Sequence, residues 1–408
     1  ALNTLNLLGF NVSQGSAPIQ MMRDLGWRLF TTTCVYDPDP DVAAAQWEPA
    51  ANAIAAELQT EQGQWKYSMM PHYAISDEIT TLDFRGVPAA RRDGWFRDYL
   101  RAKGVSDTDL PWPIDQVSYP ADAMWGTTLP RSSDLPTRRY YYWASKVGQW
   151  WSARQLRHTS DLIRGSLPWM KTETLPASHA FMGAWGAPYV GMGYRNLDLF
   201  ELCAQQAVDV PAAEDWFGLN YMYWQNYTWS GAQTFECIAA ILRSGIGDRP
   251  MTLMGLITPS DDEYLRLKAF SALGQGAKKF YFWTFSPTYI GTENYWSDLR
   301  SQYDGLAKFT RALEEAEDVL FEARPVSDRV AILYSVSHDI WFPDDPAVFA
   351  ERRLLWHALR HLHLQPDFLR EEDVEGGRLG DYDVLYMTDW CVSRAASTAI
   401  DAWVRSGG

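Results

Sequence analysis

Short apolar segments alternate with amphipathic segments along most of this chain, and that alternation limits the folds that it can adopt. Alternating strands and helices favour an α/β fold with a parallel sheet. In the first three quarters of the chain, the expected strands cover 5–12, 28–33, 67–79, 170–181, 208–217, 251–258 and 280–285. The helices expected between them cover 18–25, 42–61, 94–102, 140–164, 197–207, 232–243 and 264–273.

Seven strands are one fewer than a (β/α)8 barrel contains. We therefore expect a (β/α)8 TIM barrel over residues 1–323, with its first strand upstream of Ala1. The chain does not begin with Met, and residues 401–408 stop where a helix is expected to lead into another strand. These two features predict a fragment of a longer protein.

The pattern changes after the linker Arg324-Pro325. The elements expected there are a strand at 330–334, a helix at 350–361, and extended segments at 367–369 and 384–387. Buried strands that alternate with helices predict a doubly wound, flavodoxin-like α/β domain over 324–408.

The third expected strand ends in two adjacent carboxylates, Asp77 and Glu78. Barrel enzymes place catalytic carboxylates at the carboxyl ends of their parallel strands, where the adjacent strand end is desolvated. Glycoside hydrolysis needs a carboxyl group that protonates the leaving oxygen, and such a site can raise the pKa of that group. An acidic pair is also typical of a helix N-cap or a turn. The motif alone leaves both interpretations open.

Charge and aromatic content narrow the classes of function. The net charge of −15 argues against nucleic acid or an anionic membrane surface as a partner, because both attract an excess of Lys and Arg. No apolar run approaches the roughly 18 residues of a membrane span. The chain contains 20 Trp, whose rings can stack on the C–H faces of sugars. A large core also uses such rings, so their number alone does not identify a carbohydrate ligand.

Five segments resemble segments of the family-42 glycoside hydrolases, the trimer-forming β-galactosidase type, or of a close relative in the same retaining clan. Ile75-Ser76-Asp77-Glu78 resembles a strand end of the type Ile-Asp-Asn-Glu, whose Glu is the general acid/base. The other similar segments are the helix 96–101, the strand 208–217, the last barrel strand 276–283 with its aromatic end, and 328–334, which resembles the start of a glutamine-amidotransferase-like domain. The resemblance implies a barrel glycosidase in which Glu78 is the acid/base.

One strand departs from the pattern of that family. The resemblance implies a nucleophilic Glu at the end of the seventh barrel strand, but 251–259 contains no carboxylate. For the second catalytic carboxylate we favour Glu214 and Asp215, which end an apolar strand. The alternatives are Asp261 and Asp262, which also fit a helix N-cap, no second carboxylate at all, and Glu173.

Side chains at or after the strand ends are candidates for contact with a sugar, because ligands of barrels lie there. Besides Asp77, which would orient Glu78, the candidates are His179, Trp216, Tyr281, Trp283 and Trp296. Each has a structural alternative, which is core packing for the rings and an internal hydrogen bond for the histidine. No HExxH, closely spaced cysteine or dinucleotide-loop pattern is present, so we expect neither a metal nor a cofactor.

The sequence therefore predicts a glycoside hydrolase that acts on oligo- or polysaccharides with Glu78 as general acid/base. Retaining and inverting chemistry both stay open. The alternative is a catalytically degenerate barrel that binds carbohydrate without cleaving it. The expected partners are a carbohydrate and, through the second domain, further copies of the same chain.

Overall fold

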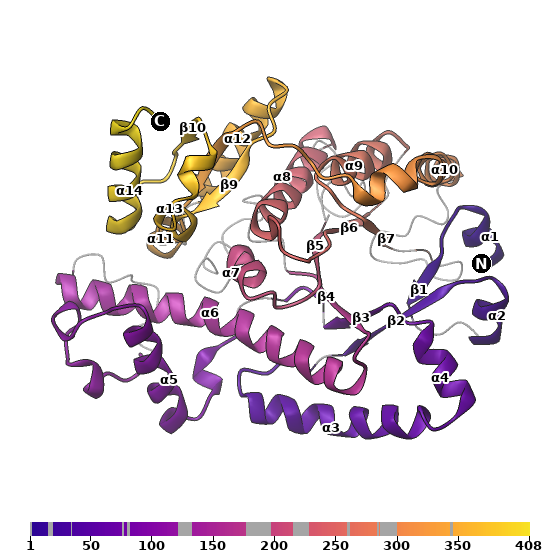
Figure 1. The fold of residues 1–408 in the computed structure, drawn as a ribbon, viewed down its shortest axis with the longest axis horizontal. Coiled ribbons are helices and arrows are strands. Elements are labelled where there is room, and N and C mark those ends of the chain that lie inside the picture. The colour runs from indigo at the N-terminus through magenta and orange to yellow at the C-terminus, as the bar shows by residue number, and fades with distance from the viewer. Residues whose placement is uncertain are drawn as a thin grey trace.

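The computed structural model describes most of the chain (Figure 1). The described residues are 2–14, 19–33, 35–75, 77–79, 82–120, 133–176, 197–214, 228–258, 262–283, 285, 300–342 and 346–408. They form two parallel sheets, one of seven strands and one of three.

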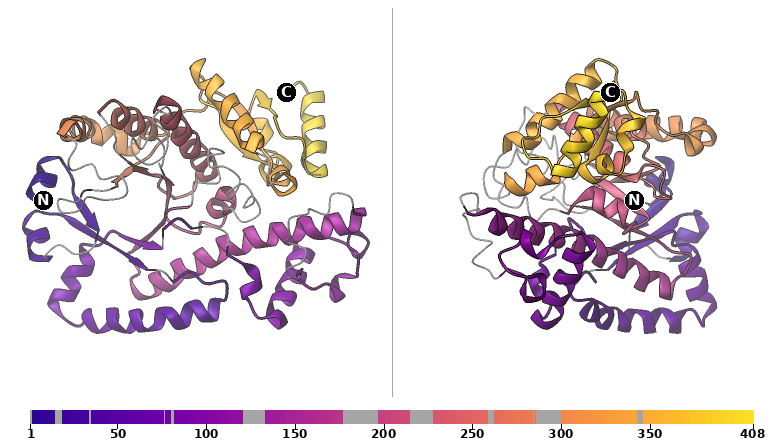
Figure 2. Two further views of the ribbon diagram at one scale, coloured as in Figure 1. Left: turned by 180° about the vertical axis from the view of Figure 1, so that it is seen from behind. Right: turned by 60° about the vertical axis from the view of Figure 1, so that its left-hand side comes forward.

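The larger sheet follows chain order and is parallel throughout. Its strands are β1 (Val12–Gln14), β2 (Arg28–Thr33), β3 (His72–Ile75), β4 (Lys171–Thr174), β5 (Val210–Glu214), β6 (Met254–Ile257) and β7 (Lys279–Phe282). The sheet curls into a half-barrel (Figure 1; Figure 2, left). No ladder joins β7 to β1 in the described chain, but the rings of Phe10, just before β1, and Phe282 on β7 lie 5.5 Å apart. The two edge strands therefore approach each other.

Helices connect these strands and lie around the outside of the curled sheet (Figure 1). They are α1 (Leu2–Leu7), α2 (Ile19–Asp24), α3 (Pro40–Glu57), α4 (Glu61–Ser68), α5 (Ala89–Ala102), α6 (Leu135–Ser166), α7 (Leu199–Ala204), α8 (Thr228–Ile246), α9 (Asp262–Gly274) and α10 (Arg300–Glu322). The long connection between β3 and α6 contains α5 and a second aromatic core that packs against α6. Most of these helices agree with the helices expected from the sequence, although their ends differ from the expected ones.

Strand side chains alternate between two cores. Ala213, Ile257 and Phe282 pack in the large core that the strands share with the helices. A separate cluster consists of Leu175, Val210, Ala212, Met254 and Leu256 with Tyr281 and Trp283 against it. Because successive side chains of a strand point to opposite faces, this second cluster fills the interior of the curled sheet.

The first expected strand, 5–12, is wrong for most of its length. Leu2–Leu7 form α1, and only the last residue of the expected range belongs to β1. Leu5 and Leu8 pack on the core, whereas Leu7 is 82% exposed. Buried positions three residues apart are a helical spacing, and strand alternation would have buried every second residue.

A smaller sheet follows α10. Its strands are β8 (Val330–Tyr334), β9 (Asp367–Arg370) and β10 (Val384–Tyr386), and its helices are α11 (Val336–Trp341), α12 (Pro346–His361), α13 (Glu371–Glu375) and α14 (Arg394–Arg405). The strands are parallel in the order β10–β8–β9. The first three strands of a flavodoxin-like sheet have this same order.

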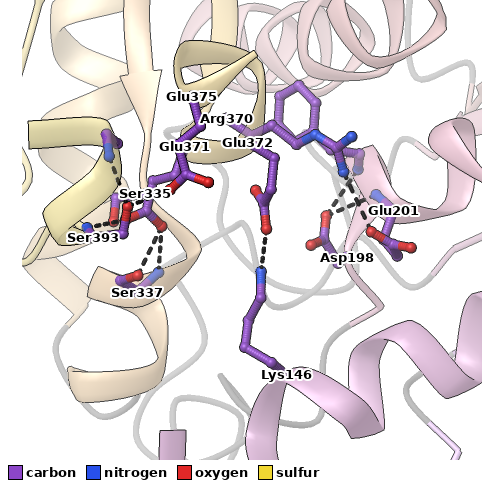
Figure 3. Close-up of polar contacts among 12 residues, drawn as sticks. Lys146, Asp198, Glu201, Ser335, Ser337, Arg370, Glu371, Glu372, Glu375 and Ser393 are labelled. Atoms are coloured by element: carbon purple, nitrogen blue, oxygen red, sulfur yellow. Dashed lines mark hydrogen bonds and ion pairs between the residues drawn. The ribbon is translucent and has the colours of Figure 1, made fainter. Parts of the chain in front are cut away.

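The residues that follow β8 and β9 lie near α6 and α7, two helices of the larger unit (Figure 3). Lys146 extends from α6 and donates to Glu372 at 2.8 Å, and the Lys146 side chain is 8% exposed. Arg370 forms an ion pair with Glu201 on α7 at 3.3 Å. Largely buried charges therefore join the smaller sheet to the helices that surround the half-barrel.

The Lys146–Glu372 ion pair predicts a pH-dependent stability. Burial opposes the ionisation of Glu372, but the charge and hydrogen bond of Lys146 and the charge of Arg370 outweigh it and lower the pKa of Glu372 to about 2 from 4.5. Such a carboxyl stabilises the fold above its unfolded pKa, and the contribution is lost as the pH falls toward the folded pKa. At pH 6 we expect Lys146→Met to lower the free energy of unfolding by roughly 1–3 kcal/mol. Urea unfolding at pH 6, 4 and 3 should show this difference shrink as the pH falls.

The pair between Lys66 and Glu57 offers a matched control. Its N–O distance is 2.6 Å, but its side chains are 28% and 44% exposed. Lys66→Met should therefore change the free energy of unfolding by no more than about 1 kcal/mol. Equal effects of the two substitutions at pH 6 would contradict a stabilising role for the Lys146–Glu372 pair.

Candidate active site

Asp77 and Glu78 lie directly beyond β3, at its carboxyl end, as the sequence predicts. Both residues are exposed, so the described residues do not bury these carboxylates as the sequence led us to expect. Glu78 has a φ of +46°, in the left-handed region that residues other than glycine rarely adopt. Such strained backbone persists where its surroundings hold it, and it is concentrated at functional sites.

The backbone on either side of Glu78 is attached to β4 and to Leu175, the residue that follows it. Thr174 Oγ1 donates to the carbonyl oxygen of Ile75 at 3.1 Å, and the N–H of Ile79 donates to that of Leu175 at 2.9 Å. Glu78 therefore lies between two attachments to the neighbouring strand. These attachments supply the surroundings that hold its unusual φ.

Glu214 is the last residue of β5 and is 1% exposed. Val210 and Ala212, four and two residues before it, belong to the interior cluster. Strand alternation therefore directs Glu214 toward the interior as well. Since β3, β4 and β5 are successive parallel neighbours, Glu78 and Glu214 lie at the same end of the sheet.

Tyr281 and Trp283 of the β7 segment face the interior, with ring centroids 6.3 Å apart. Burial raises the pKa of Tyr281, and the negative charges of Asp77 and Glu173 raise it further. Asp77 and Tyr281 are thus brought close enough to interact, although they come from opposite parts of the sheet. Trp283 Nε1 is buried without a hydrogen-bond partner among the described residues, so its N–H can donate to a ligand oxygen.

Glu173 also points into the interior, but ion pairs engage its carboxylate. His72 Nδ1 lies 2.8 Å from its Oε2, and Lys279 Nζ contacts the same oxygen. Burial alone would raise the pKa of Glu173, but His72 and Lys279 hold it below its usual value. These contacts favour a structural role. Sequence reasoning missed the ion pair, although the alternation of Lys279, Tyr281 and Trp283 along one strand was a signal for an inward lysine.

Part of the predicted site lies outside the described residues. The candidates concerned are Asp215, His179, Trp216 and Trp296, and the alternative Asp261 lies there too. Asp262 is the first residue of α9, which agrees with the helix-start interpretation of that acidic pair. The roles of the residues outside the described ranges stay predictions.

Comparison with solved structures shows the fold. The β-galactosidase of the Antarctic haloarchaeon Halorubrum lacusprofundi matches with a TM-score of 0.67 at 14% identity, over 100% of this chain and 69% of that one. The β-galactosidase from Bacillus circulans sp. alkalophilus matches at a TM-score of 0.65 and 14% identity, over 100% of this chain and 67% of that one. A GH42 exo-carrageenase from Bacteroides ovatus matches at 0.61 and 12%, over 100% and 58%. The chain therefore has a fold like that of GH42 glycoside hydrolases, which confirms the barrel-type fold that the sequence predicts.

Other comparisons add no assignment. No protein-family model matches the chain, and no curated protein matches it either. Within the described residues, no helix combines the length and apolarity that crossing a membrane requires. The case for a function therefore depends on the geometry of the site together with the fold.

Proposed function

We propose that this chain is a glycoside hydrolase domain with Glu78 as its general acid/base. The observation that carries the proposal is the position of Glu78, exposed at the carboxyl end of β3 on a strained and anchored backbone. Barrel enzymes hold their catalytic groups at this end of the sheet. The structural neighbours include β-galactosidases and an exo-carrageenase, so β-galactosides and carrageenan oligosaccharides are the first substrates to test.

The second carboxylate of the proposal is Glu214, with Asp215 beside it. The inward direction and burial of Glu214 at the end of β5 support this role. Retaining hydrolysis needs its two carboxyls about 5 Å apart, and inverting hydrolysis needs a wider gap that admits water. The anomeric form of the first product, followed by NMR, distinguishes the two mechanisms.

The proposed sugar contacts come from the interior and from loops at the same end. Tyr281 and Trp283 offer ring faces and an indole N–H that has no acceptor among the described residues, and Asp77 would orient the acid/base. From the sequence we add the candidates outside the described ranges, His179, Trp216 and Trp296. We also keep the division into a barrel domain over 1–323 and a second, amidotransferase-like domain over 324–408 as proposals, together with self-association through the latter.

A second candidate function is a barrel that binds carbohydrate without cleaving it. The specific observation in its favour is that β6 (Met254–Ile257) and the buried Thr258 after it present no carboxylate. The resemblance to family-42 enzymes implies the nucleophile at this strand. An interior that retains aromatic rings but lacks that group would still hold a sugar.

Assays on the full chain separate these two functions. We expect release of nitrophenol from 4-nitrophenyl β-D-galactopyranoside, or of reducing ends from carrageenan oligosaccharides, with a kcat on the order of 1 s⁻¹ or above. Calorimetric titration with galactose and with the same oligosaccharides measures binding independently. Binding without product would support the second function, and neither binding nor product would contradict both.

A further inference from the structure

Ser152, in the middle of α6, joins that helix to two loops at the carboxyl end of the half-barrel. Its side chain is fully buried. Its Oγ accepts a hydrogen bond from the backbone N–H of Leu82 at 2.8 Å and donates one to the carbonyl oxygen of Gly148 at 2.8 Å. Its own carbonyl oxygen accepts from Tyr36 Oη at 3.4 Å. Ser152 therefore links the loop that follows β3 to the loop that follows β2.

Leu82 lies four residues beyond Glu78 in the same connection. The attachments of Ile75 and Ile79 to β4 fix the segment before and just after Glu78. The Ser152–Leu82 hydrogen bond adds a third attachment, and it comes from a different element. The acidic segment is thus held both by the sheet and by α6.

The helix that bears Ser152 is itself held along its length. Trp151 Nε1 donates to the carbonyl oxygen of Pro38 at 2.8 Å, and Thr159 Oγ1 donates to that of Val35 at 2.9 Å. Six residues before Ser152, Lys146 binds Glu372 of α13, the helix that follows β9 (Figure 3). Because α6 is fixed at these points, a hydrogen bond from it restricts the position of Leu82.

We propose that Ser152 is a positioning residue, which holds the segment with Asp77 and Glu78 so that the Glu78 carboxyl reaches the glycosidic oxygen. This inference rests on the proposed function of Glu78. Ser152 touches no substrate in this arrangement and acts only through the backbone at Leu82. Misplacement of a catalytic group by about 1 Å can lower a rate by as much as 100-fold.

The test compares Ser152→Ala with Ser145→Ala. Ser145 is also buried on α6, and in the described residues its hydroxyl bonds only to the carbonyl oxygen of Tyr141, within the helix. The substrates are phenyl β-D-galactopyranoside, whose leaving group needs a proton, and the 2,4-dinitrophenyl glycoside, whose leaving group does not. In Ser152→Ala we expect the single-turnover rate of glycosidic cleavage to fall at least about tenfold more for the phenyl than for the dinitrophenyl glycoside, with KM little changed. Ser145→Ala should leave the ratio of the two cleavage rates unchanged.

Hydrogen exchange gives a readout that does not depend on activity. Peptides that cover 77–86 should exchange faster in Ser152→Ala than in the parent or in Ser145→Ala. Faster exchange with an unchanged ratio of the two cleavage rates would reduce Ser152 to a structural residue and overturn the proposal, as would unchanged exchange. A parent chain that is inactive on both glycosides and on carrageenan oligosaccharides would instead overturn the proposed function, and the positioning role with it.

Discussion

Glu78→Gln is expected to lower the kcat for phenyl β-D-galactopyranoside by about 10²–10⁴-fold, because the phenolate leaves poorly without a proton. Glutamine keeps the size of the side chain and removes the transferable proton. For the 2,4-dinitrophenyl glycoside the same substitution should lower the rate of glycosidic cleavage by less than about tenfold, because that leaving group needs no acid. Steady-state kinetics with the two glycosides, and with the burst of the first turnover resolved, measure both effects.

Glu214→Gln is the contrasting variant. A nucleophile or a general base acts whatever the leaving group, so this substitution should lower the rates for both glycosides by at least about 10²-fold. Glu78 is exposed, so Glu78→Gln should unfold at the same denaturant concentration as the parent. If Glu78→Gln slows both glycosides equally, or neither, Glu78 is not the acid.

The sequence predicts several elements of this fold well because local patterns decide them. The strands β2 and β8 have the predicted bounds, 28–33 and 330–334, because β8 is an apolar run and β2 combines Leu29 and Phe30 with three β-branched threonines. The third strand begins later than expected, because Tyr67 belongs to α4. There the side chain of Thr60 caps the helix by accepting from the N–H of Gly63, and a lone threonine is a weak sequence signal.

The candidate site is predictable only in part, since its geometry comes from contacts between distant segments. The position of Glu78 at a strand end follows from the sequence, but its φ of +46° depends on attachments to β4, about 100 residues later. The same holds for Ser152, because no local pattern links it to Leu82, which is 70 residues away. Strand alternation gives the direction of Glu214 once the ends of β5 are known.

The smaller sheet contains a buried charge where related architectures bind ligands. Doubly wound sheets hold ligands at the carboxyl ends of the strands, where the strand order reverses, which here is between β8 and β10. Arg352 of α12 occupies this place and is 1% exposed. Its Nε donates to Asp389 at 2.7 Å and its Nη1 to Asp339 at 2.8 Å. Asp389 also accepts from the N–H of Ser335 at 2.7 Å. The protein's own side chains thus fill the crevice, which favours a structural role for this sheet.

Arg352→Met should therefore lower the free energy of unfolding by about 3–5 kcal/mol, because it leaves the buried Asp389 carboxylate without its countercharge. The matched control is Arg329→Met, since Arg329 pairs with Asp383 at 2.8 Å but the two side chains are 55% and 67% exposed. That control should change stability by no more than about 1 kcal/mol.

Adding Asp389→Asn to Arg352→Met tests whether the loss comes from the uncompensated charge. Asparagine keeps an acceptor for the N–H of Ser335 and removes the charge, so the double variant should recover part of the lost stability. Denaturant unfolding of the parent and the variants gives each value. If Arg352→Met lowers the free energy of unfolding no more than Arg329→Met does, Arg352 does not stabilise the sheet. If the double variant is less stable than Arg352→Met, the destabilisation comes from lost packing around Arg352 and not from the Asp389 charge.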